Sequence, residues 1–132
     1  MAELIPLITD MLKRPETHKV LSTVTPDGKP HSIVCGSLIV KDPSTIMVGQ
    51  VYLTRTCVNL ANNRNVEFLV WRGPDAYSIQ ATFVSRQDSG PEMEKMTQLL
   101  AKMNMVPTAV LEFSVDSAYY EGITEKAGTQ VL

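Results

Sequence analysis

The sequence has few of the residues that metal and nucleophile chemistry require. Its 132 residues include two histidines and two cysteines, with no CxxC pair and no cluster of metal-ligand spacing. We therefore expect no metal site. No apolar run approaches the roughly 20 residues that span a bilayer, so no membrane segment is expected. The GxGxxG and GxxxxGK[ST] motifs are also missing, which argues against a Rossmann or P-loop nucleotide site.

The chain also lacks an excess of positive charge. Twelve Lys and Arg residues oppose 14 Asp and Glu residues, and the pI is about 5.6. Such a balance gives no general attraction for phosphate backbones, so nucleic-acid binding is not expected. The opening MAELIPLITDML has neither the basic segment nor the cleavage site of a signal peptide, and two cysteines make no disulfide framework. These features predict a cytoplasmic protein.

Six short runs have the composition and alternation of β-strands. The predicted strands cover residues 19–25, 31–40, 45–51, 66–72, 77–86 and 109–120. Asp27-Gly28 between the first two predicts a β-hairpin. Because closing a sheet removes its exposed edges, six strands with turn-length connections favour a mainly β, antiparallel barrel. Apolar residues on both faces of several strands indicate that helices or a second copy of the chain cover the outside.

Three helices are expected beside the strands. Residues 3–13 carry apolar side chains at helical spacing, and Pro15 helps to end that helix. A short second helix opens near residue 54. Pro91 begins the third helix, with acidic residues in its first turn, and Pro107 marks its far end. We expect one domain over residues 1–132, with its core at about 17–118 and a loosely ordered tail at about 121–132.

A cysteine nucleophile receives little support from the sequence. His31 and Cys35 are four residues apart, which is about 13 Å along a strand at roughly 3.3 Å per residue. They cannot share a hydrogen bond, although His18 stays open as a partner brought in by the fold. Free buried cysteines usually pack as small hydrophobes. The catalytic residues, if the protein has any, remain unknown from the sequence.

The most informative stretch is LTRTCVNLANNRN at residues 53–65. It places Arg55 between Thr54 and Thr56, with no neighbouring acid, at the expected start of the second helix. Unpaired N–H groups at a helix N-terminus, two hydroxyls and a guanidinium suit one phosphate monoester. The alternative is that Thr54 is only an N-cap and Arg55 a solvated side chain.

The hairpin PDGKPHSIV, the strand TIMVGQ, the segment TRTCVNLANNRNVEF and the strand SIQATFVSR resemble the pyridoxamine 5′-phosphate oxidase-like FMN-binding split barrels, especially the small single-domain FMN-binding proteins. The resemblance covers roughly residues 17–118. It implies a six-stranded antiparallel split barrel with Greek-key-like connections and about three helices. It also implies that Arg55 and Thr56 hold the FMN phosphate, with Thr54 and Asn59 as supports.

The same resemblance implies where the flavin ring lies. It would run along two strands and be contacted largely by their main chain, at Ser32, Ile33, Val34, Cys35, Gly36, Val48, Gly49 and Gln50. Two FMN sites would form at the interface of a homodimer, which would also cover apolar outer strands. The loop around Met105 and Pro107 of the partner chain would lie near the ring.

The resemblance leaves the activity open. After Arg86 the chain has no further Arg or His, whereas the true oxidase has a basic, histidine-bearing C-terminal segment for its substrate, so pyridoxamine phosphate oxidation is not expected. An FMN-dependent electron carrier or oxidoreductase acting with a small-molecule or protein partner is the leading hypothesis. The alternatives are a deazaflavin (F420)-dependent reductase on the same barrel and a cofactor-free binding module.

Overall fold

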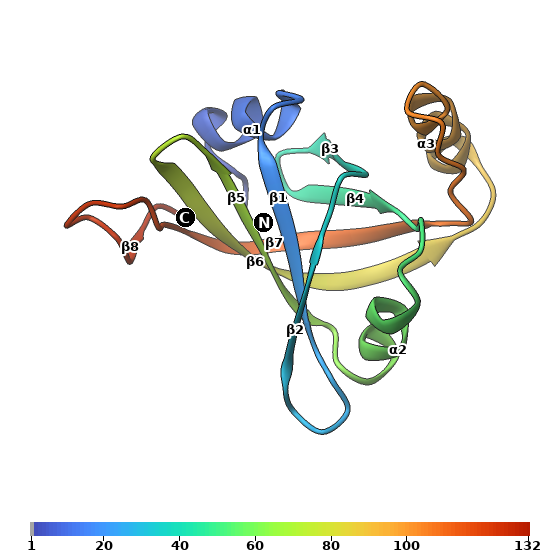
Figure 1. Cartoon of the computed structure of the whole chain (residues 1–132), viewed down its shortest axis with the longest axis horizontal. Coiled ribbons are helices and arrows are strands. Elements are labelled where there is room, and N and C mark those ends of the chain that lie inside the picture. The colour runs from blue at the N-terminus through green and yellow to red at the C-terminus, as the bar shows by residue number, and fades with distance from the viewer. Residues whose placement is uncertain (1) are drawn as a thin grey trace.

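The computed structural model describes residues 2–132 as one antiparallel sheet with three helices (Figure 1). The helices are α1 (Pro6–Lys13), α2 (Thr54–Asn62) and α3 (Pro91–Ala101). The strands are β1 (His18–Val24), β2 (Pro30–Val34), β3 (Leu38–Asp42), β4 (Thr45–Gly49), β5 (Asn65–Arg72), β6 (Asp75–Gln87), β7 (Val110–Tyr120) and β8 (Thr129–Gln130). The mainly β prediction is confirmed, and all three predicted helices are present.

The predicted count of six strands is wrong. The sheet has eight strands in the order β2-β1-β5-β6-β7-β4-β3, with the short β8 beside β7. The run at residues 31–40 was expected as one strand, but it forms β2 and β3, which lie at the two ends of this order. An apolar run contains no local signal for such a break, because both halves have strand composition.

The break occurs where the chain passes from one edge of the sheet to the other. The Cys35 N–H donates to the Lys19 carbonyl of β1 at 2.8 Å. Two residues later the Ser37 carbonyl accepts from the Gly49 N–H of β4 at 3.0 Å. Two residues only two positions apart thus pair with β1 and β4, which lie near opposite ends of the strand order. This crossing brings the two edges together and makes the sheet a split barrel.

The helix ends follow from simple backbone rules. Arg14 has extended dihedrals after α1, as expected of a residue before proline. Helix α3 ends at Ala101, earlier than Pro107, and Asn104 then adopts a positive φ of 56°. None of the helices within residues 2–132 is long and apolar enough to cross a membrane.

The core lies inside the curved sheet and under α1. Fully buried side chains include Leu21, Ile46, Phe68 and Phe113, and the two phenylalanine rings meet edge to face at 5.3 Å. Ile8 and Leu12 of α1 are buried in the same cluster. Burial of these apolar side chains is the main stabilising term of the fold.

The C-terminal tail is more ordered than predicted. Its β8 pairs with the end of β7, and the Val131 N–H donates to the Ala118 carbonyl at 2.8 Å. Val131 and Leu132 are half-buried against the core. The expectation of a loosely ordered tail is wrong, because its polar composition concealed these backbone bonds.

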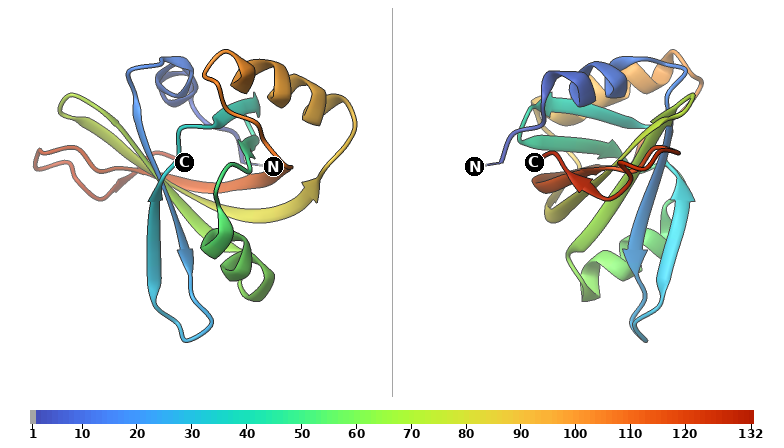
Figure 2. Two further views of the ribbon diagram at one scale, coloured as in Figure 1. Left: turned by 45° about the vertical axis from the view of Figure 1, so that its right-hand side comes forward. Right: turned by 90° about the vertical axis from the view of Figure 1, so that its left-hand side faces the viewer.

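The helices divide between the two ends of the sheet. Figure 2 shows α1 and α3 near one another at one end, while α2 lies at the other end beside the hairpin of β1 and β2. The start of α2 and the region between α1 and α3 are therefore separate places on the molecule.

Candidate functional site

Helix α2 begins without a side-chain cap. Thr54 is the first helical residue, Leu53 stands at the cap position, and no side chain bonds the first backbone N–H groups. The alternative interpretation of Thr54 as an N-cap is therefore wrong. The open N–H groups of the first turn and the helix dipole make this end of α2 attractive to an anion.

Thr56 is the unusual residue of this turn. It is 1% exposed, and its Oγ1 has no hydrogen-bond partner within the described structure. Buried hydroxyls are nearly always paired, since an unpaired one loses about 1–3 kcal/mol of solvation. The Thr56 hydroxyl is thus a buried polar group that has no partner among residues 2–132.

Three arginines, Arg55, Arg64 and Arg86, lie in α2 or in the segments discussed with it, and they differ in their contacts. Arg55 is exposed and takes part in none of the three ion pairs found within residues 2–132. Arg86 of β6 donates from its Nε to Gln50 Oε1 at 2.9 Å. Burial raises the pKa of the Cys57 thiol in α2, and the charge of Arg86 partly opposes that rise. The sequence did not point to Arg86, which is 31 positions from Arg55 and enters only through the fold.

Arg64 has a structural role. Its Nη1 donates to the carbonyls of Phe83 and Val84 at 2.9 and 3.2 Å, and its guanidinium lies 5.3 Å from the centre of the Phe83 ring. These contacts attach the chain beyond α2 to β6. Of the two arginines in the informative stretch, only Arg55 has a guanidinium without such partners.

Asn59 lies on the inner face of α2. It is 3% exposed, and its Nδ2 donates to Thr23 Oγ1 of β1 at 2.9 Å. His31 of β2 stands opposite Thr23 in the ladder, and its Nδ1 is buried without a partner among residues 2–132. Asn59 therefore positions α2 on the sheet. His31 is a polar residue of this region that the sequence suggested only as part of a cysteine dyad.

Strand β2 has an open edge that exposes main-chain groups. It is the last strand of its side of the sheet, and the Cys35 N–H bonds toward β1. Because residues alternate along an antiparallel ladder, the backbone groups of Ser32 and Val34 face away from β1 while those of Ile33 face toward it. The Val34 side chain is 83% exposed. Main-chain donors and acceptors are thus available beside an exposed apolar side chain.

The second strand predicted to contact the flavin ring, β4 with the following Gln50, has fewer unpaired main-chain groups than β2. Val48 and Gly49 are buried, and Gly49 exchanges hydrogen bonds with Ser37, accepting from its Oγ at 2.7 Å. The Gln50 N–H donates to Ala109, and its carbonyl accepts from Thr108. The backbone of Gly49 and Gln50 is therefore already paired within the chain.

The remaining predicted positions, Cys35, Gly36 and Met105, have no reactive side chain at neutral pH. Burial raises the pKa of the Cys35 thiol to about 12, so it is protonated at neutral pH. Gly36 is exposed, and Met105 is half-buried beside Met96 and Leu100. Within residues 2–132 no three metal-ligating side chains come together.

Comparisons with known proteins agree with this architecture. The structure of HupZ from Group A Streptococcus superimposes with a TM-score of 0.80 at 19% identity, covering 95% of this chain and 99% of that one. An FMN-binding protein from Syntrophomonas wolfei subsp. wolfei gives 0.74 at 16% identity, covering 81% and 78%. A structure named F420 reductase gives 0.67 at 14%, covering 83% and 93%.

These identities establish likeness of fold. No curated protein matches the sequence. The profile of one protein family, described as pyridoxamine 5′-phosphate oxidase, matches residues 8–122, which is most of the chain. By sequence and by fold, the chain belongs to the pyridoxamine 5′-phosphate oxidase family.

Proposed function

We propose that the chain is an FMN-binding flavoprotein whose cofactor phosphate is held at the start of α2 by Arg55, Thr54 and Thr56. The observation that carries this proposal is the buried, unpaired hydroxyl of Thr56 in the first turn of an uncapped helix. A phosphate there would accept from that hydroxyl, from backbone N–H groups and from the guanidinium. Asn59 supports the site indirectly by holding α2 on β1.

The open edge of β2 supports placing the flavin ring along residues 32–36. An isoalloxazine ring has nitrogen and oxygen atoms at its rim and an apolar face, which match the free backbone groups of Ser32 and Val34. Ile33, Cys35, Gly36, Val48, Gly49 and Gln50 would form the adjoining wall. When bound, FMN supplies one- and two-electron transfer, while the chain binds and orients it.

We propose further that the working form is a homodimer. Val34 and Val106 are 83% and 80% exposed, and Tyr52, just before α2, is 98% exposed. Large apolar side chains so exposed to water suit coverage by a second copy. In that dimer the segment around Met105 would approach the ring of the partner.

The activity we favour is electron transfer or flavin-dependent reduction or oxidation of a small molecule. Likeness to a structure named F420 reductase favours one second candidate, a deazaflavin-dependent reductase, since that cofactor also carries phosphate and a flat ring.

The test is reconstitution followed by gel filtration. The protein is incubated separately with FMN, with F420 and with riboflavin, and the absorbance of the eluted protein peak is recorded. We expect FMN at one per chain in a peak of dimer size, and little riboflavin, because riboflavin lacks the phosphate. Retention of F420 alone would favour the reductase, and retention of neither would favour a cofactor-free module.

A further inference from the structure

A cavity lies at the other end of the sheet from α2, between α1, β3 and α3. Its volume is ≈ 530 Å³, within the range of small-molecule sites. Figure 2 shows the two helices facing each other above β3. The cavity shares no lining residue with the turn that carries Thr56.

The lining combines an apolar wall with positive charge. Seven aliphatic or methionine side chains line it, among them Leu38, Ile39 and Leu99. The charged lining residues are all cations, namely Lys13, Arg14, Lys19, Lys95 and Lys102. No acidic residue lines the cavity, although acids outnumber bases in the whole chain.

The positive charge converges from separate elements. Lys13 lies in the last turn of α1 and Arg14 is its C-cap, a place where the helix dipole by itself favours cations. That explanation does not apply to Lys19 of β1 or to Lys95 within α3. None of the five takes part in an ion pair of residues 2–132, in which the paired cations are Lys41 and Arg72.

Lys19 is the deepest of these cations. It is half-buried, and burial lowers the pKa of its ammonium because no carboxylate compensates the lost hydration. A bound anion would supply that compensation. The adjacent aliphatic wall would at the same time remove an apolar body from water.

We propose that this cavity binds a small amphipathic anion, a carboxylate or phosphate head on an elongated apolar body. The head lies among Lys19, Lys95 and Lys102, and the body lies against Leu38, Ile39 and Leu99. The site uses none of the residues of the α2 turn, and Gly36 is the one lining residue that it shares with the wall proposed for the flavin ring.

Titration calorimetry on the chain as purified, without added flavin, tests the proposal. The probe is dodecanoate below its micelle concentration, compared with dodecanol as the body alone and acetate as the head alone. Dodecanoate is expected to bind at one per chain, and each control compound at least tenfold more weakly. Dodecyl phosphate in place of dodecanoate distinguishes a phosphate from a carboxylate preference. Equal binding of dodecanol, or no binding of either dodecyl anion, would overturn the proposal.

Variants locate the site. The double change Lys95→Gln and Lys102→Gln is expected to weaken dodecanoate binding about five- to tenfold, from two exposed charge contacts. Lys19→Met keeps the side-chain volume and is expected to weaken it further. Lys29→Gln with Lys126→Gln removes the same charge elsewhere and serves as the matched control. If the control pair weakens dodecanoate binding as much, the loss comes from the change in net charge, and the proposed position of the site is wrong.

A filling substitution checks the apolar wall. Leu99→Trp places a larger side chain in the cavity and is expected to abolish dodecanoate binding while circular dichroism stays that of the parent. If Leu99→Trp fails to fold, Ile39→Phe provides the same test on β3. Unchanged affinity in a folded filling variant would contradict the proposed position of the body.

Discussion

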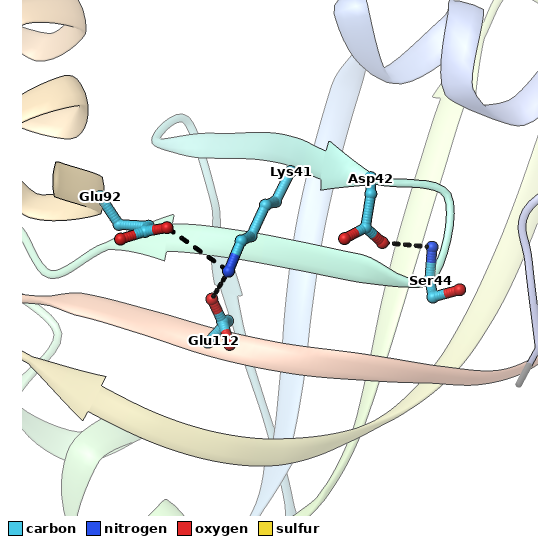
Figure 3. Close-up of polar contacts among 5 residues, drawn as sticks. All are labelled: Lys41, Asp42, Ser44, Glu92 and Glu112. Carbon is cyan, nitrogen blue, oxygen red and sulfur yellow. Dashed lines mark hydrogen bonds and ion pairs between the residues drawn. The ribbon is translucent and has the colours of Figure 1, made fainter.

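The Lys41 ammonium lies 2.9 Å from the Glu112 carboxylate and so joins β3 to β7 across the strand between them (Figure 3). The same ammonium lies 3.5 Å from Glu92 in the first turn of α3. Nearby, Asp42 accepts from the Ser44 N–H at 2.8 Å and closes the turn between β3 and β4. The two Lys41 ion pairs hold the first turn of α3 beside β3 and β7.

Lys41→Met should loosen the start of α3. The Lys41 side chain is 38% exposed, so the loss should be modest, about 0.5–1 kcal/mol of unfolding free energy at pH 7 by urea denaturation. The hydrogen bond to Glu112 raises the pKa of Lys41 above its ordinary 10.5. The contribution is therefore complete below pH 10.5 and is lost as pH rises through the raised value, so parent and variant should converge there. Lys29→Met is the control, and an equal loss in it would remove the role assigned to Glu92 and Glu112.

Thr56→Val should separate stability from cofactor binding. Valine keeps the shape but removes the unpaired buried hydroxyl, so the flavin-free protein should gain about 1 kcal/mol in thermal or urea unfolding. FMN affinity, measured by fluorescence quenching of the flavin, should fall at least tenfold. Thr97→Val is the control, since that hydroxyl is exposed and bonds Met93 within α3. Unchanged FMN affinity in Thr56→Val would contradict the proposal that Thr56 helps to hold the FMN phosphate.

Arg55→Ala should weaken FMN with little effect on the fold. The side chain is exposed and unpaired in residues 2–132, so unfolding free energy should change by under about 0.5 kcal/mol. Loss of one charge-assisted contact of about 1.5–3 kcal/mol should weaken FMN by about ten- to a hundredfold. Arg72→Ala, at a distant ion pair with Glu16, provides the comparison. Riboflavin affinity should not respond to Arg55→Ala; a parallel loss of riboflavin would mean that Arg55 contacts the ring.

Gly49→Ala should destabilise the contact of β4 with α3. A Cβ at this position would stand 2.7 Å from Leu100 Cδ1 and 3.1 Å from Met96 Cγ. Overpacking of this kind typically costs about 1–3 kcal/mol, here observable in urea unfolding. Gly36→Ala is a matched control, because its Cβ would meet nothing within 4 Å. Equal stability of the two variants would show that α3 yields at this contact.

Alkaline pH should destabilise the fold through Cys35. Its pKa rises from an ordinary 9.0 to about 12 on folding, so the folded state binds the proton more tightly. Stability from this group is complete below pH 9 and falls by up to about 1.4 kcal/mol per pH unit as pH rises toward 12. Cys35→Ala should flatten that slope in urea unfolding between pH 9 and 11, whatever its effect at pH 7. A slope identical to the parent would mean that other groups cause the alkaline loss.

Local rules predicted the elements that local forces make. Pro15 and Pro91 marked a helix end and a helix start, and Asp27-Gly28 marked the hairpin, because each acts through the dihedrals of its own neighbours. The division of residues 31–40 was missed because it depends on two bonds to opposite edges of the sheet. The ordered tail was missed for the same reason, since β8 exists only where β7 lies beside it.

The candidate site divides in the same way. The spacing of Thr54, Arg55 and Thr56 at a helix start was readable in the sequence, because hydroxyls and a cation without acids have a local chemical meaning. Only the tertiary structure decided that Thr56 is buried without a partner, that Asn59 bonds Thr23, and that the charge of Arg86 acts on Cys57 of α2. Burial and pairing are properties of the surroundings, and those surroundings come from β1 and β6, far away in the sequence. The sequence thus determined which hydroxyl and cationic groups stand at the start of α2. The packing of the sheet decided which of those groups are buried and which lack a hydrogen-bond partner.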